Sequence, residues 1–335
     1  MKIRENVPLS ELTTMRLGGP ARFLYDIESE TEIPTAFDFV SSHHLPFHIL
    51  GGGANTIARD KGFPGVIIRF LESGITATPN GDSTLITAAA GTPWDDVVAF
   101  TASRGFTGIE ALSKIPGLTG AAPVQNIGAY GQDISDTFVS AKAYDTKSHT
   151  FVTLEASDLH FSYRHSILNT TDIGRYLITS VTLRLHEGQM SRPFYNSIER
   201  FIDSHNITDS SPNSIRNIVS TIRADKLPDP LERPSAGSFF KNIYLTESEA
   251  AAAEQKGYPV YRGHDGLKIN SAWLIEEAGL KGALLHGFRV NPKAPLVLIN
   301  DSATSYSDLA AARAEIISAV QSKFNYTLEQ EPIEL

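Results

Sequence analysis

Two adjacent glycine-rich runs decide what kind of fold to expect from this chain: Ile115-Pro116-Gly117-Leu118-Thr119-Gly120-Ala121-Ala122-Pro123 and Gln125-Asn126-Ile127-Gly128-Ala129-Tyr130-Gly131. So much glycine, proline and amide disfavours regular structure, so we expect a loop that covers something. A second glycine turn, Gly51-Gly52-Gly53-Ala54-Asn55, directly follows the strand-like run at 47–50. A backbone without Cβ atoms can turn tightly there or approach a ligand closely.

Two glycine turns in one chain raise the question of a bound nucleotide. The turn that begins at Gly51 lacks the Gly-Lys-Ser/Thr ending of a Walker A loop, and no G-x-G-x-x-G in the chain joins a strand to a helix. Successive N–H groups in glycine turns can still hold a diphosphate without either motif. For each turn taken alone, an ordinary tight turn is the better explanation.

Hydrophobic periodicity places helices and strands alternately around these turns. The pattern predicts helices and strands in three stretches. A polar region at 187–234, with two short helices and a boundary at Leu227-Pro228-Asp229-Pro230, separates the last stretch from the other two. The last helix follows a Ser305-x-x-Asp308 capping box and repeats Leu309, Ile316, Val320 and Phe324 on one face. The predicted helices are 30–42, 94–103, 271–278 and the one after Ser305, and the predicted strands are 47–50, 66–70, 177–185 and 296–299.

Composition narrows the class of protein. The 335 residues carry a formal net charge of -9, which argues against general nucleic-acid binding. The chain has no cysteine, so cysteine nucleophiles, iron–sulfur clusters and zinc–cysteine sites are excluded, and no histidine pattern predicts another metal site. Neither a signal peptide nor a membrane span is evident, and we expect a cytoplasmic protein that binds no membrane.

Two further segments carry residues suited to chemistry. Arg164 stands among hydroxyls and an aromatic in Phe161-Ser162-Tyr163-Arg164-His165-Ser166 and presents a planar fork that fits a carboxylate or phosphate. A surface arginine with Tyr163 packed beneath it explains the spacing equally well. Ser238, in Ser235-Ala236-Gly237-Ser238-Phe239-Phe240-Lys241-Asn242, lies among small residues. A serine hydroxyl can donate a proton only to a strongly basic centre such as an enolate-like intermediate.

Taken in order, the motifs resemble the UDP-N-acetylenolpyruvoylglucosamine reductase family, also called UDP-N-acetylmuramate dehydrogenases. The resemblance spans nearly the whole chain. Besides the two glycine regions, it rests on Thr14-Met15-Arg16-Leu17-Gly18-Gly19-Pro20-Ala21, Tyr163-Arg164-x-Ser166, Gly237-Ser238-Phe239-Phe240-Lys241-Asn242 and Leu328-Glu329-Gln330-Glu331. Gln330-Glu331-Pro332 stands where the family more often has Pro-Glu-Val.

The resemblance implies an α+β fold with a two-lobed FAD-binding domain of the vanillyl-alcohol-oxidase (PCMH) type and a C-terminal α+β substrate domain. The implied divisions are 1–70 for the first FAD lobe, 71–225 for the second and 226–325 for the substrate domain, with the tail 326–335 returning near the active site. The implied reaction reduces UDP-N-acetylglucosamine enolpyruvate to UDP-N-acetylmuramate in peptidoglycan synthesis, with FAD as cofactor and NADPH as hydride donor. A monomer is expected.

Site residues follow from the same resemblance. Arg164, Ser238 and Glu331 would be catalytic: Arg164 as the cation near the substrate carboxylate, Ser238 as the proton donor, and Glu331 acting with Arg164 or as a protonated donor. The substrate would be bound by Tyr163, Tyr195, Lys226, Lys241 and Asn242, of which Tyr195 matches a tyrosine that covers the substrate in the longer subtype. The implied FAD contacts are Gly51, Gly52, Gly53, Ala54, Asn55, Pro116, Gly117, Gly120, Gln125, Asn126, Gly128, Ala129 and Gly131.

Two alternatives stay open at this point. One is another flavin oxidoreductase on the same domain, such as an oxidase that reacts with oxygen. The other is a flavin- or nucleotide-sugar-binding protein without turnover, although binding alone has no need of a proton donor.

Overall fold

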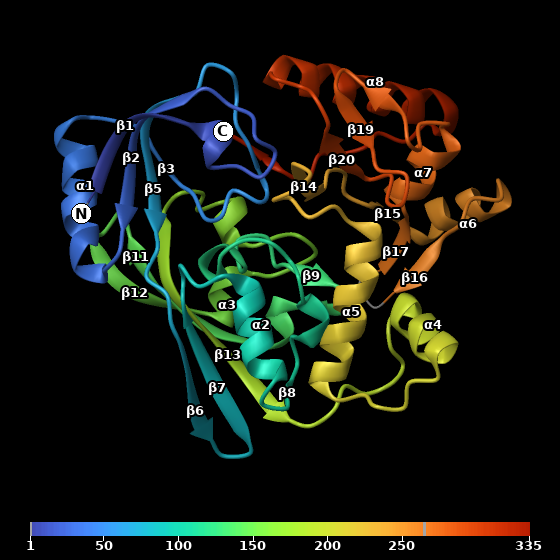
Figure 1. Ribbon diagram of the computed structural model, residues 1–335, viewed down its shortest axis with the longest axis horizontal. Coiled ribbons are helices and arrows are strands. Elements are labelled where there is room, and N and C mark those ends of the chain that lie inside the picture. Colours follow the sequence, from blue (N-terminus) through green and yellow to red (C-terminus); the bar gives the residue numbers. More distant parts are fainter. Residues whose placement is uncertain (1, 264–265) are drawn as a thin grey trace. The chain divides into compact units, whose positions relative to one another are not determined.

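A computed structural model describes residues 2–263 and 266–335 of the chain (Figure 1). The chain forms two compact units. The first unit comprises the residues up to Val7, Ala21–Gly52 and Pro64–Arg223, and the second comprises Pro8–Pro20, Gly53–Phe63 and Ala224–Leu335. The predicted division of the flavin domain into two lobes at residue 70 stays a prediction.

The first sheet of the first unit has the strand order β1-β2-β5-β3, and β3 runs parallel to β5. Its helix α1 (Ile33–Ser42) follows a short 3-10 turn at Glu30–Glu32, which agrees with the predicted helix at 30–42. Ala36, Phe37 and Val40 face the core at a helical spacing. The strands are β1 (Lys2–Pro8), β2 (Pro20–Ile27), β3 (Phe47–Ile49) and β5 (Phe63–Phe70).

The second sheet has the order β12-β11-β13-β7-β6, and β8 adds to one end of β13. Its central strand is β13 (Tyr176–Glu187), in which Leu177, Val181, Leu183 and Leu185 are buried, as the alternating pattern predicts. Strands β6 and β7 form the long hairpin at the edge of this sheet (Figure 1). The other strands are β6 (Ile75–Asn80), β7 (Ser83–Ala89), β8 (Phe106–Thr107), β11 (Phe138–Asp145) and β12 (Thr150–Glu155), and the helices beside them are α2 (Trp94–Ala102) and α3 (Ala156–Leu159).

Two helices occupy the polar region where two were predicted. They are α4 (Asn196–His205) and α5 (Pro212–Lys226), and they share a small core of Ile198, Ile202, Ile215 and Val219. The remaining short elements of the first unit are β9 (Gly128–Ala129), β10 (Gln132–Asp133) and 3-10 turns at Glu110–Leu112, Thr119–Ala121, Ile134–Asp136 and Ile167–Asn169.

The second unit contains a four-stranded sheet of order β14-β20-β19-β18 and a three-stranded sheet of order β15-β17-β16. Helix α8 (Tyr306–Phe324) buries Leu309, Ile316, Val320 and Phe324 in its core, and Ser305 and Asp308 form the predicted capping box. The elements are a 3-10 turn at Leu9–Glu11, β4 (Thr56–Ile57), β14 (Ser235–Ser238), β15 (Ile243–Leu245), α6 (Glu247–Gln255), β16 (Tyr261–Gly263), β17 (Gly266–Ile269), α7 (Ser271–Glu277), β18 (Leu284–Leu285), β19 (Phe288–Val290), β20 (Val297–Asn300), α8 and β21 (Ile333–Glu334).

Residues 8–20 and 53–63 contribute to the core of this second unit. Met15, Leu17 and Ile57 are fully or almost fully buried there, in contact with the cluster that includes Phe239 and Phe240. Among the described residues, no helix has the length and apolar character needed to span a bilayer.

Candidate functional site

The two glycine regions of the first unit pack backbone against backbone. A Cβ atom on Gly51 would stand 2.9 Å from the Cβ of Ala121, and one on Gly52 would stand 3.0 Å from the Cα of Gly117. Real Cβ atoms essentially never approach closer than 3.0 Å, and 3.0 Å is tighter than most of their contacts, so glycine suits this close packing. The structure thus brings together parts of two regions that lie more than sixty residues apart in the chain.

This arrangement fits the diphosphate of FAD. Within the described part of the chain, the backbone N–H groups of Gly51, Gly52 and Gly117 have no hydrogen-bond acceptor. N–H groups at glycine turns form anion-binding concavities, so these residues could hold a diphosphate. Pro116 is exposed beside them, and Gln125 is partly buried.

Residues 53–55, which complete the turn that begins at Gly51, belong to the second unit. Gly53 has a φ of +63°, and a Cβ there would stand 1.9 Å from the carbonyl oxygen of Leu12, so this position also requires glycine. Ala54 is partly buried. The carbonyl of Asn55 accepts a 2.9 Å hydrogen bond from the N–H of Ile333 in β21. The predicted FAD contacts at residues 53–55 therefore include the point where the C-terminal strand attaches.

Arg164 sits at a tight turn that is fastened to the second glycine run. Its φ is +53°, and its guanidinium donates to the carbonyls of Asn126, at 3.2 Å, and Gly128, at 2.5 Å. It also lies 3.6 Å from the carboxylate of Asp133. The Asn126 side chain returns a 3.1 Å hydrogen bond to the carbonyl of Ser162. These bonds hold the Arg164 turn against the predicted cofactor loop.

The end of that loop is a hairpin. β9 and β10 pair across Tyr130 and Gly131, whose φ values are +50° and +85°. Positive φ at both central residues is the mark of a type I′ turn, which explains the glycine at 131. Ala129 precedes the turn, and Tyr163 lies against the Arg164 guanidinium, with its ring centroid 5.0 Å from the guanidinium carbon.

Two further candidate site residues, Tyr130 and Arg223, lie in or beside this hairpin and were not among the site residues predicted from the sequence. The Tyr130 ring meets the ring of Tyr195 edge to face at 5.7 Å, and the Tyr130 hydroxyl is hydrogen-bonded to Arg223 on α5. Burial raises the pKa of Tyr130 against the opposing charge of Arg223, and burial lowers the pKa of Arg223. Tyr195 is 52% exposed at the start of α4. The sequence held one signal for Arg223, which precedes the predicted substrate ligand Lys226 by about one helical turn.

In the second unit, Ser238 and Glu331 come from segments that pair with each other. The N–H of Glu331 donates to the carbonyl of Phe239 at 2.9 Å, and the N–H of Lys241 donates to the carbonyl of Glu329, also at 2.9 Å. Phe240 thereby opposes Gln330 in an antiparallel bridge. Ser238 ends β14, directly before this bridge. Two of the three predicted catalytic residues therefore lie on adjoining backbone.

The predicted substrate ligands of the second unit lie near this pairing or on the flank of α5. The Lys241 ammonium forms a 2.5 Å ion pair with Glu329, and the Asn242 side chain accepts a 3.2 Å hydrogen bond from the N–H of Ser271 at the start of α7. Lys226 is exposed, and its carbonyl accepts a 2.9 Å hydrogen bond from the side-chain amide of Asn291. Their role toward the substrate stays a prediction.

Comparison with known proteins defines first the class and then the family. A family model described as an FAD binding domain matches residues 21–154, which include both glycine runs, so the class is that of an FAD-dependent flavoprotein. A second model, described as the C-terminal domain of UDP-N-acetylenolpyruvoylglucosamine reductase, matches residues 229–334. The predicted fold class is confirmed by these two matches.

Relatives match over the full length of the chain. The UDP-N-acetylenolpyruvoylglucosamine reductase of Streptomyces avermitilis is 36% identical, with 98% of this chain and 93% of the relative covered. That of Ralstonia nicotianae is 35% identical, with 97% of each covered. A crystal structure of the reductase from Thermus caldophilus superposes with a TM-score of 0.68 over 99% of each chain at 24% identity, which shows the shared fold. The chain belongs to the UDP-N-acetylenolpyruvoylglucosamine reductase family.

Proposed function

We propose that this chain uses FAD and NADPH to reduce UDP-N-acetylglucosamine enolpyruvate to UDP-N-acetylmuramate, with Ser238, Arg164 and Glu331 as its catalytic residues. Membership of the reductase family supports the reaction. The residue roles are supported chiefly by one observation, the hydrogen bond from the Glu331 N–H to the Phe239 carbonyl, because it aligns the tail with the strand that carries Ser238.

The cofactor supplies the redox chemistry. When bound, FAD would supply hydride transfer between NADPH and the terminal vinyl carbon of the substrate. The backbone N–H groups of Gly51, Gly52 and Gly117 would hold its diphosphate. Over the whole reaction NADPH loses a hydride, and the substrate gains that hydride and one proton.

Ser238 is assigned the proton transfer. Hydride addition at the vinyl carbon leaves negative charge on the neighbouring carbon, which also bears the carboxylate. That carbon is basic enough to take the hydroxyl proton of a serine, and the serine is then reprotonated from solvent. The new bonds are one C–H bond at each carbon of the former double bond.

Arg164 is assigned the stabilisation of the substrate carboxylate. A cation beside that carboxylate lowers the energy of the charge that develops during hydride addition. Its bonds to the Asn126 and Gly128 carbonyls fix the plane of the guanidinium before substrate arrives. Glu331 is assigned a supporting role as a hydrogen-bond donor in its protonated form.

The Ser238→Ala variant tests these roles in the absence of oxygen. NADPH should bleach the flavin of this variant at the wild-type rate. Colour recovery on adding UDP-N-acetylglucosamine enolpyruvate should slow by roughly 10²- to 10⁴-fold, which is the usual contribution of a positioned proton donor. Ser235→Ala is the matched control, since the same substitution is made in the same strand at a residue with no assigned role.

Other outcomes would favour other functions. Unchanged recovery in Ser238→Ala would remove Ser238 as the proton donor. Bleaching without recovery in the wild type would leave a flavin oxidoreductase with a different acceptor. Cytoplasmic location and the monomeric state remain predictions from the sequence.

A further inference from the structure

One arginine contacts the residues on both sides of Glu331. Arg313, on α8, donates through the same Nη1 atom to the side-chain oxygen of Gln330, at 2.6 Å, and to the carboxylate of Glu334. Its other terminal nitrogen lies 3.5 Å from the Tyr306 hydroxyl. Gln330 immediately precedes Glu331, and Glu334 follows it by three residues. The guanidinium therefore links both ends of a five-residue segment whose second residue is Glu331.

The contacts within the segment are continuous. The side-chain amide of Gln330 donates a 2.7 Å hydrogen bond to the carbonyl of Pro332. Glu334 also accepts from Arg59 at 2.8 Å. Burial works to raise the pKa of Glu334, but the hydrogen bonds from Arg59 and Arg313 outweigh it and hold the pKa at about 2. The carboxylate is therefore charged at neutral pH, and the link to Arg313 persists there.

The backbone alone holds this segment at two separated points. On one side, the Glu331 N–H is bonded to Phe239, and on the other, β21 pairs in parallel with β4 through the N–H groups of Ile333 and Leu335. The chain leaves one pairing and enters the other between Glu331 and Ile333. Pro332, which lies between them, has no N–H to donate. The bonds of Arg313 to Gln330 and Glu334 add a side-chain link across this short backbone connection.

We propose that Arg313 is a positioning residue that sets the place of Glu331 relative to Ser238 for the proton-transfer half of the reaction. The inference rests on the proposed function, which gives Glu331 its role. Arg313 and Glu334 have side chains that are only 25% and 22% exposed, so their ion pair is partly shielded from water. A charged hydrogen bond in such surroundings fixes geometry better than an exposed pair does.

The test uses the FAD-loaded protein and separates the two half-reactions. In Arg313→Gln, flavin bleaching by NADPH should stay within twofold of wild type. Recovery of colour with saturating UDP-N-acetylglucosamine enolpyruvate should slow by about 10- to 100-fold, since a misplacement on the order of 1 Å costs that much. Arg313→Lys keeps the charge but loses the planar fork, and should recover part of the rate.

Two controls identify the cause of any loss. Arg289→Gln removes another ion pair of the second unit, Arg289 with Asp301 at 2.5 Å, whose side chains are 35% and 25% exposed. The Arg289 guanidinium also donates to the carbonyl of Gly282, which lies outside the tail. This variant should keep both half-reaction rates. Amide hydrogen exchange should show faster exchange at Glu331 and Ile333 in Arg313→Gln and no change there in Arg289→Gln.

Each outcome addresses a different statement. Glu331→Gln is measured in the same assay, and wild-type recovery in that variant would remove the role of Glu331 in the proposed function. If Glu331→Gln is slow but Arg313→Gln recovers at the wild-type rate, the positioning role of Arg313 is wrong while the proposed function stands. Equal slowing of both half-reactions in Arg313→Gln would also overturn it, because a general structural defect would then explain the loss.

Discussion

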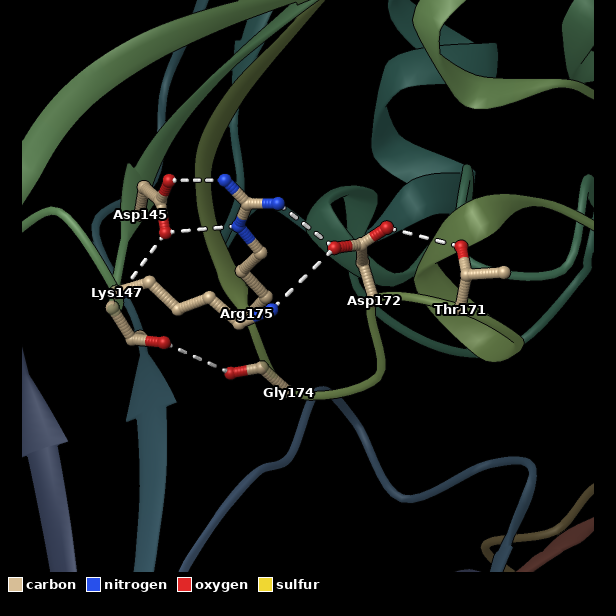
Figure 2. A network of polar contacts seen from close by, with 7 residues as sticks. Asp145, Lys147, Thr171, Asp172, Gly174 and Arg175 are labelled. Atoms are coloured by element: carbon tan, nitrogen blue, oxygen red, sulfur yellow. Dashed lines mark hydrogen bonds and ion pairs between the residues drawn. The ribbon is translucent and has the colours of Figure 1, made fainter.

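A buried carboxylate at the end of strand β11 shows how one residue depends on its partners. Asp145 closes β11 and is 3% exposed. The Arg175 guanidinium donates hydrogen bonds to both carboxylate oxygens of Asp145, at 2.8 and 3.1 Å, and the N–H of Lys147 donates a third at 2.9 Å. Figure 2 shows Arg175 between Asp145 and Asp172. A buried carboxylate is tolerated only with such hydrogen bonds.

This site predicts a pH-dependent contribution to stability. Chiefly the hydrogen bonds from Arg175, against the opposing effect of burial, lower the pKa of Asp145 to about 2. The pKa of an aspartate in an unfolded chain is about 3.9. The stabilisation from Asp145 is therefore fully present above about pH 5 and is lost as the pH falls toward 2. The gain at neutral pH is on the order of 2 kcal/mol.

Asp145→Asn should therefore destabilise the protein more at pH 7 than at pH 3. We expect the free-energy difference from wild type, measured by urea unfolding, to narrow by about 1 kcal/mol between these pH values. Asp82→Asn, at an exposed turn, is the control and should give no such narrowing. A penalty for Asp145→Asn that is the same at both pH values would count against the linkage.

At the scale of the element, helix α8 joins a local signal to a distant one. The Ser305 hydroxyl accepts from the N–H of Asp308 at 3.1 Å, and the Asp308 carboxylate accepts from the N–H of Ser305 at 3.1 Å. Asp60, from a remote part of the chain, accepts from the N–H of Tyr306 at 2.6 Å. The start of the helix is thus capped by its own sequence and also by a tertiary contact.

Ser305→Ala should lower the free energy of unfolding by about 1 kcal/mol, because it removes an acceptor that a helix start requires. Ser305→Asp should retain most of the stability, since aspartate is an equally good cap. Ser318→Ala, at an exposed position within the same helix, should cause no loss. Urea denaturation of the three variants measures the differences, and a stability for Ser305→Ala equal to that of Ser318→Ala would refute the cap's contribution.

At the scale of the whole molecule, the path of the chain couples the second unit to residues far from it in sequence. The chain passes between the units after residues 7, 20, 52, 63 and 223. Met15, Leu17 and Ile57 enter the core of the second unit, and burying each contributes about 1.5 to 3 kcal/mol. Their sum is comparable with the whole stability of a domain, about 5 to 15 kcal/mol.

A fragment of residues 224–335 should therefore lack a cooperative thermal transition, although it includes the whole match to the C-terminal family model. Circular dichroism during heating measures this. Addition of a peptide covering residues 8–63 should restore part of the transition, because it returns those three side chains and the β4 partner of β21. A sharp transition in the fragment alone, at the temperature of the full chain, would contradict this view of the core.

Local patterns were sufficient to predict much of the molecule. The glycine at 131 in a two-residue hairpin turn, the alternation in β13 and the capping box at Ser305 each depend on residues a few positions apart, so their physical requirement is visible in the sequence. The motifs together predicted the FAD cofactor and the reductase family, which the comparisons confirm.

Tertiary structure alone decided how distant residues meet. The pairing of Glu331 with Phe239, the bonds of Arg164 to the loop at Asn126, the contact of Tyr130 with Arg223 and the hold of Arg313 on the tail join segments 17 to 93 residues apart. No local propensity encodes these contacts, because each arises only when sheets and helices have packed and buried the apolar surface between them. The sequence by itself therefore determined which chemistry the protein carries, and the packing of each unit decided which side chains support it.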